Sequence, residues 1–337
     1  MPAANPVLIE VMRGGAVESR HRGAVAIVDS TGRRTISWGD TKTAVFPRSA
    51  VKPLQALPMV ESGAAEALAV SPGELALACA SHSGEEMHVK GVEIWLARLG
   101  LSADDLVCGP HPPLGEAAAA DLLRTGTAPS RLHNNCSGKH AGFLTLARHI
   151  GVSTVGYANS AHPVQLQVLA TLAELADFDV ERASIATDGC GVPVVAVPLQ
   201  GLARAFARFA APDCPPDARA AAACRVSGSM TKHPSMIGGA GRFDTLVVEA
   251  AGGTLLVKSG AEGVACAALL DQGVGIAVKI DDGGKRAVET AMAALLLRFA
   301  SPDSRLRQTL EAWVPMPIRD TRGESVGAVR PAAGWLD

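Results

Sequence analysis

Ser49 and Lys52 have the residue types and the spacing of a serine nucleophile with its own base. If Ser49 opens a helix, Lys52 lies one turn further along the same face, and its amine can reach the Ser49 hydroxyl. Activation requires a neutral amine, which burial or a second cation nearby produces near neutral pH. The plainer interpretation is a helix N-cap followed by a solvated lysine. Other segments must decide between the two.

The elements around these residues follow the order strands, helices, strands. Segments 7–12, 23–29 and 35–38 are strand-like, and from Ser49 to about 235 the pattern is mainly helical, with predicted serine caps at Ser71, Ser83 and Ser102. Strands are expected again at 244–250 and 254–260, joined by a Gly252-Gly253 hairpin, and at 274–280, before a helix at 285–299. The sequence therefore predicts an α/β (α+β) fold in which both chain ends build one antiparallel sheet around a mostly helical insert.

We expect a single domain over residues 1–337, with a sheet subdomain at about 1–48 and 240–337 and a helical subdomain at about 49–239. Penicillin-recognising serine acyl-transfer enzymes have the same order of elements. They keep a K-[ST]-G motif on the returning strand, where this chain has Lys258-Ser259-Gly260. This position favours Ser49 and Lys52 as catalytic residues. Ser81 is the candidate for a third polar group, because Ser83 is explained as a helix cap.

Cys136 and Cys190 lie in two polar, glycine-containing segments, 133–140 and 187–193. A thiol at a helix N-terminus has a lowered pKa, so Cys136 could be thiolate-like. Two such cysteines could hold a metal together with His140, His133, Asp188 or Lys139, but the spacing is unlike a zinc finger. From the residues alone, two buried thiols are the simpler interpretation.

Composition narrows the class of protein. The chain has 337 residues, of which 48% are hydrophobic and 19% charged, with a net charge of −2 and seven cysteines that read as reduced thiols. Basic residues are interspersed with acidic ones and there is one tyrosine, which argues against nucleic-acid binding. No apolar run approaches the ~20 residues of a membrane span. The start does not resemble a signal peptide, so we expect a soluble cytoplasmic protein.

Six ordered motifs resemble those of the rhizobial-type (class 3) L-asparaginases. They are Arg48-Ser49-Ala50-Val51-Lys52-Pro53, Ala80-Ser81-His82-Ser83, Asn135-Cys136-Ser137-Gly138-Lys139-His140, Thr187-Asp188-Gly189-Cys190, His233-Pro234 with Gly241-Arg242, and Val257-Lys258-Ser259-Gly260-Ala261. The opening Arg13-Gly14-Gly15 with Glu18 and His21-Arg22 extends the resemblance over nearly the whole chain. The resemblance implies a β-lactamase-like fold, a homodimer, and hydrolysis of L-asparagine to L-aspartate and ammonia. The closing strand expected in that family is not evident before Gly334-Trp335-Leu336-Asp337.

Carried over residue by residue, the resemblance makes Ser49 the nucleophile and Lys52 its base, with Ser81 and Lys258 as a second Ser-Lys pair. It also implies zinc bound at Cys136, Lys139 and Cys190, with Asp188 close by, which reverses the interpretation from the residues alone. Such zinc is expected to shape the site or tune affinity rather than to activate the nucleophile. Residues expected to contact the substrate are Arg48, Asp188, Arg242 and His140.

Two other classes share parts of this pattern. A β-lactam- or peptide-directed serine acyl hydrolase of the same fold would use Ser49, Lys52 and Lys258 but would not require the two cysteines. A non-enzymatic zinc or redox module would need Cys136 and Cys190 and leave the Ser-Lys pairs accidental. Release of ammonia from asparagine separates these classes.

Overall fold

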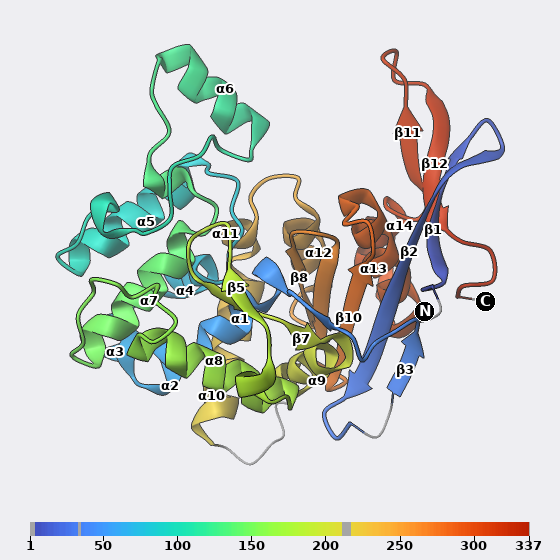
Figure 1. The fold of residues 1–337 in the computed structure, drawn as a ribbon. Helices are drawn as coiled ribbons and strands as arrows, with labels where there is room; N and C mark the ends of the chain where they lie inside the picture. The colour runs from blue at the N-terminus through green and yellow to red at the C-terminus, as the bar shows by residue number, and fades with distance from the viewer. Residues whose placement is uncertain (1–3, 33–34, 211–216, 337) are drawn as a thin grey trace.

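The computed structural model describes residues 4–32, 35–210 and 217–336. Its main sheet has eight antiparallel strands in the order β11-β12-β1-β2-β10-β9-β8, and β3 pairs with the far half of β2 (Figure 1). The strands are β1 Val7–Arg13, β2 Ala16–Asp29, β3 Thr35–Trp38, β8 Leu255–Gly260, β9 Val264–Leu269, β10 Val274–Ile280, β11 Met316–Arg319 and β12 Ser325–Pro331. The two ends of the chain therefore meet in one sheet, and the predicted fold class is confirmed.

Helices occupy most of the chain between β3 and β8. They are η1 Arg48–Val51, α1 Lys52–Gln55, α2 Leu57–Glu61, α3 Ala64–Ala67, α4 Pro72–Ala78, α5 Glu86–Arg98, η2 Ala103–Asp105, α6 Glu116–Thr125, η3 Arg131–His133, α7 Ser137–His149, α8 Pro163–Ala176, η4 Val180–Arg182, α9 Leu199–Ala210, α10 Ala218–Lys232, α11 Pro234–Ile237 and α12 Phe243–Ala251. Two small sheets pair β4 Ala44–Val45 with β7 Val197–Pro198, and β5 Ile185–Thr187 with β6 Pro193–Val195. After β10 come α13 Lys285–Phe299 and α14 Ser304–Glu311.

The core joins the sheet to the helices. α9 packs against β2, β9 and β10, and α13 packs against β1, β9, β10 and β12. A β-carbon at Gly275 of β10 would lie 1.9 Å from the carbonyl oxygen of Ala203, so only glycine allows α9 to approach this strand so closely. No helix in the described ranges is long and apolar enough to cross a membrane.

Two expectations about the sheet are wrong. Residues 244–250 form helix α12 rather than a strand, and Gly252, with a φ of 58°, ends that helix instead of turning a hairpin. The apolar residues Phe243, Val247 and Val248 lie on the buried face of this helix. The pattern was ambiguous because a short apolar run suits either a strand or a helix. The hairpin partner of β8 is β9, whose six residues are all buried.

The closing strand is also present, contrary to expectation. β12 pairs with β1 and β11 pairs with β12, so the C-terminal segment completes one edge of the sheet (Figure 1). Only Val329 of β12 is buried. Pro315, Pro317 and Gly327 also interrupt the segment, so it lacks the apolar alternation that makes a strand visible in a sequence.

Candidate active site

Ser49 lies where the helical region meets the sheet. It sits in the short 3₁₀ helix η1, which packs against β8 and β9, and it lines a cavity of about 400 Å³ together with Ser81, Asn135 and Gly260. A β-carbon at Gly260 would lie 2.6 Å from the carbonyl oxygen of Pro47, so this glycine is needed to bring the end of β8 against η1. The structure thus places the predicted nucleophile on a cavity wall.

Lys52 is the first residue of α1 and is 1% exposed. Its Nζ donates to the carbonyl oxygen of Ala80 at 2.5 Å and to Ser81 Oγ at 3.1 Å. Burial lowers the pKa of Lys52, and the positive charges of Lys139 and Lys258 lower it further, while Cys136 opposes them. The amine is therefore suited to act as a base. Among the described residues its hydroxyl partner is Ser81, on the same cavity as Ser49.

Ser81 follows α4 and is held by its backbone, whose N–H donates to the carbonyl oxygen of Ile237 at 2.9 Å. His82, fully buried, lies 2.9 Å through Nε2 from Ser137 Oγ and accepts through Nδ1 from the N–H of Gly84. The expectation that Ser83 caps the next helix is wrong. Its hydroxyl donates to the carbonyl oxygen of Gly238 at 2.7 Å, and Glu85 is the N-cap.

Lys258 is also 1% exposed, but its partner is an acid that the sequence analysis missed. Its Nζ lies 3.0 Å from Asp244 Oδ2, and Asp244 also accepts from the backbone N–H and the hydroxyl of Ser259. Burial alone would raise the pKa of Asp244, but Lys258 and Ser259 hold it below its usual value. Among the described residues, Lys258 thus pairs with Asp244 and Ser81 pairs with Lys52, rather than Ser81 with Lys258.

We expect Asp244→Asn to lower the free energy of unfolding by about 3–5 kcal/mol, because the change leaves the Lys258 ammonium buried without a counter-charge. The stabilisation from Asp244 should be complete above its unfolded-state pKa and be lost as pH falls through its lower folded-state pKa. Urea unfolding at several pH values measures both effects. Asp282→Asn, at the half-exposed carboxylate that pairs with His21, is the matched control, and an equal loss in both variants would contradict the assignment.

The two predicted cysteines do meet. One ligand atom from each of Cys136, Asp188 and Cys190 lies within 4.8 Å of the others, and Lys139 Nζ donates to Cys190 Sγ at 3.0 Å. A β-carbon at Gly138 would lie 2.3 Å from the carbonyl oxygen of Leu77, so glycine lets α7 carry its first turn into the site. Two thiols and a carboxylate are donor types that zinc accepts, and a zinc ion with Zn–S bonds of about 2.3 Å would draw tetrahedral ligand atoms to under 4 Å from one another.

The pKa values of the two thiols are shifted in opposite directions. A hydrogen bond from Cys190 lowers the pKa of Cys136, with Lys52 and Lys139 adding to this effect against the opposing burial, while the same contact raises the pKa of Cys190. Burial would lower the pKa of Lys139, but both cysteines and Asp188 raise it. Because Lys139 is cationic here, its use as a metal ligand would require release of a proton.

Of the residues expected to contact substrate, Arg48 and Asp188 contact each other. Arg48 Nε lies 2.5 Å from Asp188 Oδ1, and neither residue is among the described residues that line the cavity with Ser49. Arg48 has a φ of 51°, which is unusual for a residue with a side chain and occurs directly before the nucleophile. His140 is buried and lies 2.6 Å through Nδ1 from the Tyr157 hydroxyl, also away from the cavity lining.

The remaining candidate, Arg242, does line the cavity. It is the N-cap residue of α12. The lining also includes Glu289 and Lys285 of α13, which the sequence analysis did not single out. Glu262 of the β8–β9 turn is exposed at the rim. The cavity therefore combines the serines Ser49, Ser81 and Ser259 with charged groups of both signs.

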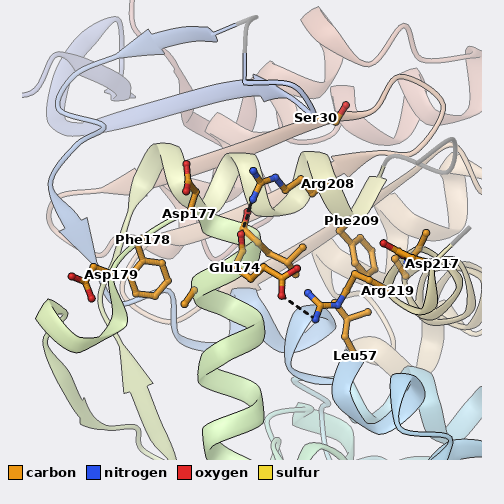
Figure 2. Close-up of a pocket in the computed structure, with 14 residues that line it drawn as sticks. Ser30, Leu57, Glu174, Asp177, Phe178, Asp179, Arg208, Phe209, Asp217 and Arg219 are labelled. Atoms are coloured by element: carbon orange, nitrogen blue, oxygen red, sulfur yellow. Dashed lines mark hydrogen bonds and ion pairs between the residues drawn. The ribbon is translucent and has the colours of Figure 1, made fainter. Parts of the chain in front are cut away.

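A larger hollow of about 700 Å³ lies between α8, α9 and α10 (Figure 2). Its arginines are engaged: Arg208 donates to the carbonyl oxygens of Glu174 and Leu175, and Arg219 pairs with Glu61 and Glu174. Among the described residues that line this hollow, no nucleophile is in hydrogen-bond contact with a base. The smaller cavity at Ser49, where serine hydroxyls lie near a buried lysine, is therefore the candidate active site.

The L-asparaginase II family model matches residues 9–331 of this chain. Among solved structures, Mglu in its native form is 17% identical with a TM-score of 0.47, and the alignment covers 89% of this chain and 70% of that chain. Mglu in the presence of 4.3M NaCl is 18% identical, with a TM-score of 0.45 and coverage of 84% and 63%. A putative beta-lactamase from Bacteroides dorei DSM 17855 is 13% identical, with a TM-score of 0.42 and coverage of 81% and 93%.

The chain spans about two thirds of the length of these Mglu chains. No curated protein matches it. The family match supports an amidohydrolase of the asparaginase type. Because that match covers most of the sequence, this chain belongs to the L-asparaginase II family.

Proposed function

We propose that this chain hydrolyses L-asparagine to L-aspartate and ammonia through a serine ester. The observation that carries the proposal is the arrangement of Ser49 and Ser81 on one cavity, with the buried amine of Lys52 hydrogen-bonded to Ser81. A nucleophile, a base and a group that relays a proton are the minimum for acyl transfer through serine. The family match supports the amide as the scissile group.

The reaction uses Ser49 as nucleophile. The neutral amine of Lys52 takes the Ser49 proton, and Ser49 Oγ attacks the side-chain amide carbon. The resulting oxyanion is stabilised by backbone donors at the start of η1 and at the end of β8, which Gly260 brings together. The carbon–nitrogen bond breaks as the Lys52 proton passes through the Ser81 hydroxyl to the leaving nitrogen. Water then cleaves the ester, and Ser49 regains its proton.

Lys258 has an electrostatic role in this scheme. Its charge contributes to the lowered pKa of Lys52, and Asp244 holds it in place. The zinc proposed at Cys136, Lys139 and Cys190, with Asp188 beside them, would supply a rigid cross-link of α7 to the 187–193 loop. No catalytic step is assigned to it, because the proposed base is Lys52, whose Nζ donates to Ser81 Oγ.

Ammonia release from a panel of amides tests the proposal. The panel comprises L-asparagine, L-glutamine, a penicillin and a short peptide, with product detection suited to each. Ammonia from L-asparagine with no turnover of the last two is the expected outcome. Hydrolysis of penicillin or peptide without ammonia release would assign the serines to a different acyl hydrolase. If none of the four compounds is hydrolysed, the chain would be a binding protein rather than an enzyme of this class.

We expect activity to rise from neutral to alkaline pH. The base works as a neutral amine, and the neutral fraction of Lys52 grows as pH passes through its lowered pKa. A fall at still higher pH follows when the cationic groups of the site lose their charge, which gives a bell with a high-lying optimum. Steady-state kinetics on L-asparagine from pH 6 to 10 measure this profile. An optimum on the acid side would contradict a lysine base.

A further inference from the structure

Glu289 is a poorly satisfied charge in the cavity wall. Its side chain is 13% exposed and lines the cavity, and its one ion-pair partner among the described residues is Lys285. The nearest cation is Lys285 Nζ at 3.7 Å, on a side chain that is itself 71% exposed. Burial raises the pKa of Glu289, and the nearby charge of Asp244 adds to this effect. A largely buried carboxylate whose one ion pair is with an exposed lysine at 3.7 Å can still accept from a donor on a ligand.

Arg242 is the complementary cation. It forms no ion pair with a described carboxylate, and its one side-chain hydrogen bond is long, 3.5 Å from Nη1 to Ser83 Oγ. This contrasts with Arg48, whose guanidinium already contacts Asp188 at 2.5 Å. The positive charge of Arg242 lowers the pKa of Glu289. The two side chains form no ion pair, because no Arg242 nitrogen lies within 4.0 Å of a Glu289 oxygen. The two charges face one cavity without neutralising each other.

We propose that Arg242 and Glu289 form the clamp that holds the amino-acid end of the substrate, with Arg242 binding the α-carboxylate and Glu289 the α-ammonium. This inference rests on the proposed function. An α-amino acid carries both charges on one carbon, which suits an arginine without an ion pair and a carboxylate with one exposed partner on the walls of one cavity. Asp244 cannot take the ammonium, because Lys258 and Ser259 already occupy its oxygens. Glu262 is solvated at the rim.

The clamp names a substrate class: amides of free α-amino acids. A peptide lacks one or both of the α charges beside its side-chain amide, and a β-lactam lacks the ammonium, so both lose a charged contact worth about 10- to 100-fold in binding. L-Glutamine retains both charges. Its extra methylene moves the amide carbon past Ser49, so we expect lower efficiency than with L-asparagine.

Substrates that lack one charge separate the two halves of the clamp. Succinamate has no α-ammonium, and 3-aminopropanamide has no α-carboxylate. Glu289→Gln keeps the shape of the side chain and should lower kcat/KM for L-asparagine about 10- to 100-fold, but change that for succinamate less than about twofold, since no ammonium contact remains to be lost. Arg242→Gln should lower kcat/KM for L-asparagine and succinamate and spare 3-aminopropanamide.

Glu262→Gln is the matched control, because it removes the same charge from the rim of the same cavity. It should leave the L-asparagine to succinamate ratio unchanged. An equal loss on both substrates in Glu289→Gln, or the same ratio change in Glu262→Gln, would overturn the clamp. Circular dichroism and thermal melts establish that each variant is folded.

Binding of L-aspartate and succinate, measured by calorimetry, tests the clamp independently of turnover. The wild type should prefer L-aspartate, and Glu289→Gln should remove that preference. If the wild type hydrolyses none of these amides, the proposed function fails. The preference for L-aspartate over succinate would still show whether Glu289 binds the α-ammonium. If it hydrolyses L-asparagine and Glu289→Gln keeps the preference, the clamp alone fails.

Discussion

Ser49→Ala is expected to lower kcat for ammonia release from L-asparagine by about four orders of magnitude or more, and Lys52→Met is expected to do the same. These two side chains act on one proton, so either loss removes the whole nucleophilic step. Lys52 is buried, so methionine is preferred because it fills the space without adding a cavity. The double variant should be no slower than either single variant, which is the signature of groups that act as a unit.

Ser81→Ala separates the two serines. Its hydroxyl contacts Lys52, so we expect a large loss of kcat from the missing proton relay, but an intact Ser49 should still form the ester. Mass spectrometry of quenched reactions should find added mass on the peptide that contains Ser49. Added mass on the Ser81 peptide, or near-wild-type rates in Ser49→Ala, would reverse the assignment. Ser62→Ala, at the end of α2, is the matched control and should retain full activity.

The order of elements was predictable because it depends on local signals. Ser259 and Gly260 are the last two residues of strand β8, and the S-x-x-K and K-S-G motifs occur in the expected order along the chain. The failure at α12 had a local cause as well, since Leu246-Val247-Val248 suits two periodicities. The strand order of the sheet, with β12 beside β1, depends on pairing between segments that are distant in the sequence. Neither segment's sequence shows which strand it pairs with.

The sequence identified several residues of the candidate site, but it did not indicate which side chains they contact. The motifs identified Lys258, but its counter-charge Asp244 lies 14 residues earlier on a helix that was taken for a strand. Glu289 follows Lys285 by four residues, a spacing typical of a solvated ion pair on a helix surface. Only the packing of α13 against the sheet shows that this carboxylate faces the cavity. The homodimer and the zinc stay predictions.

Replacing either Cys136 or Cys190 should have a similarly large effect, in this case on the zinc content of the protein. Protein purified without chelator should hold about one zinc per chain, and Cys136→Ser or Cys190→Ser should reduce the content to background, because two thiolates supply most of the affinity. Neither cysteine suffices alone. Elemental analysis of each variant measures this directly. Cys224→Ser, at the one exposed thiol among the described cysteines, is the matched control and should retain the metal.

Removing the zinc should affect binding before rate. In the apo protein the Cys190 thiol can still accept from the Lys139 ammonium, so we expect the fold to persist with a lower thermal midpoint. The 187–193 loop would then be held to the start of α7 by weaker contacts, among them the hydrogen bond from Lys139 to Cys190. Since Arg48 pairs with Asp188 in that loop and directly precedes Ser49, a looser loop displaces the nucleophile's backbone from its productive position. We therefore expect KM for L-asparagine to rise after chelation while kcat falls less, and both to recover on adding zinc. Metal-free protein with unchanged KM and melting temperature would show that the cluster holds its charges without a metal.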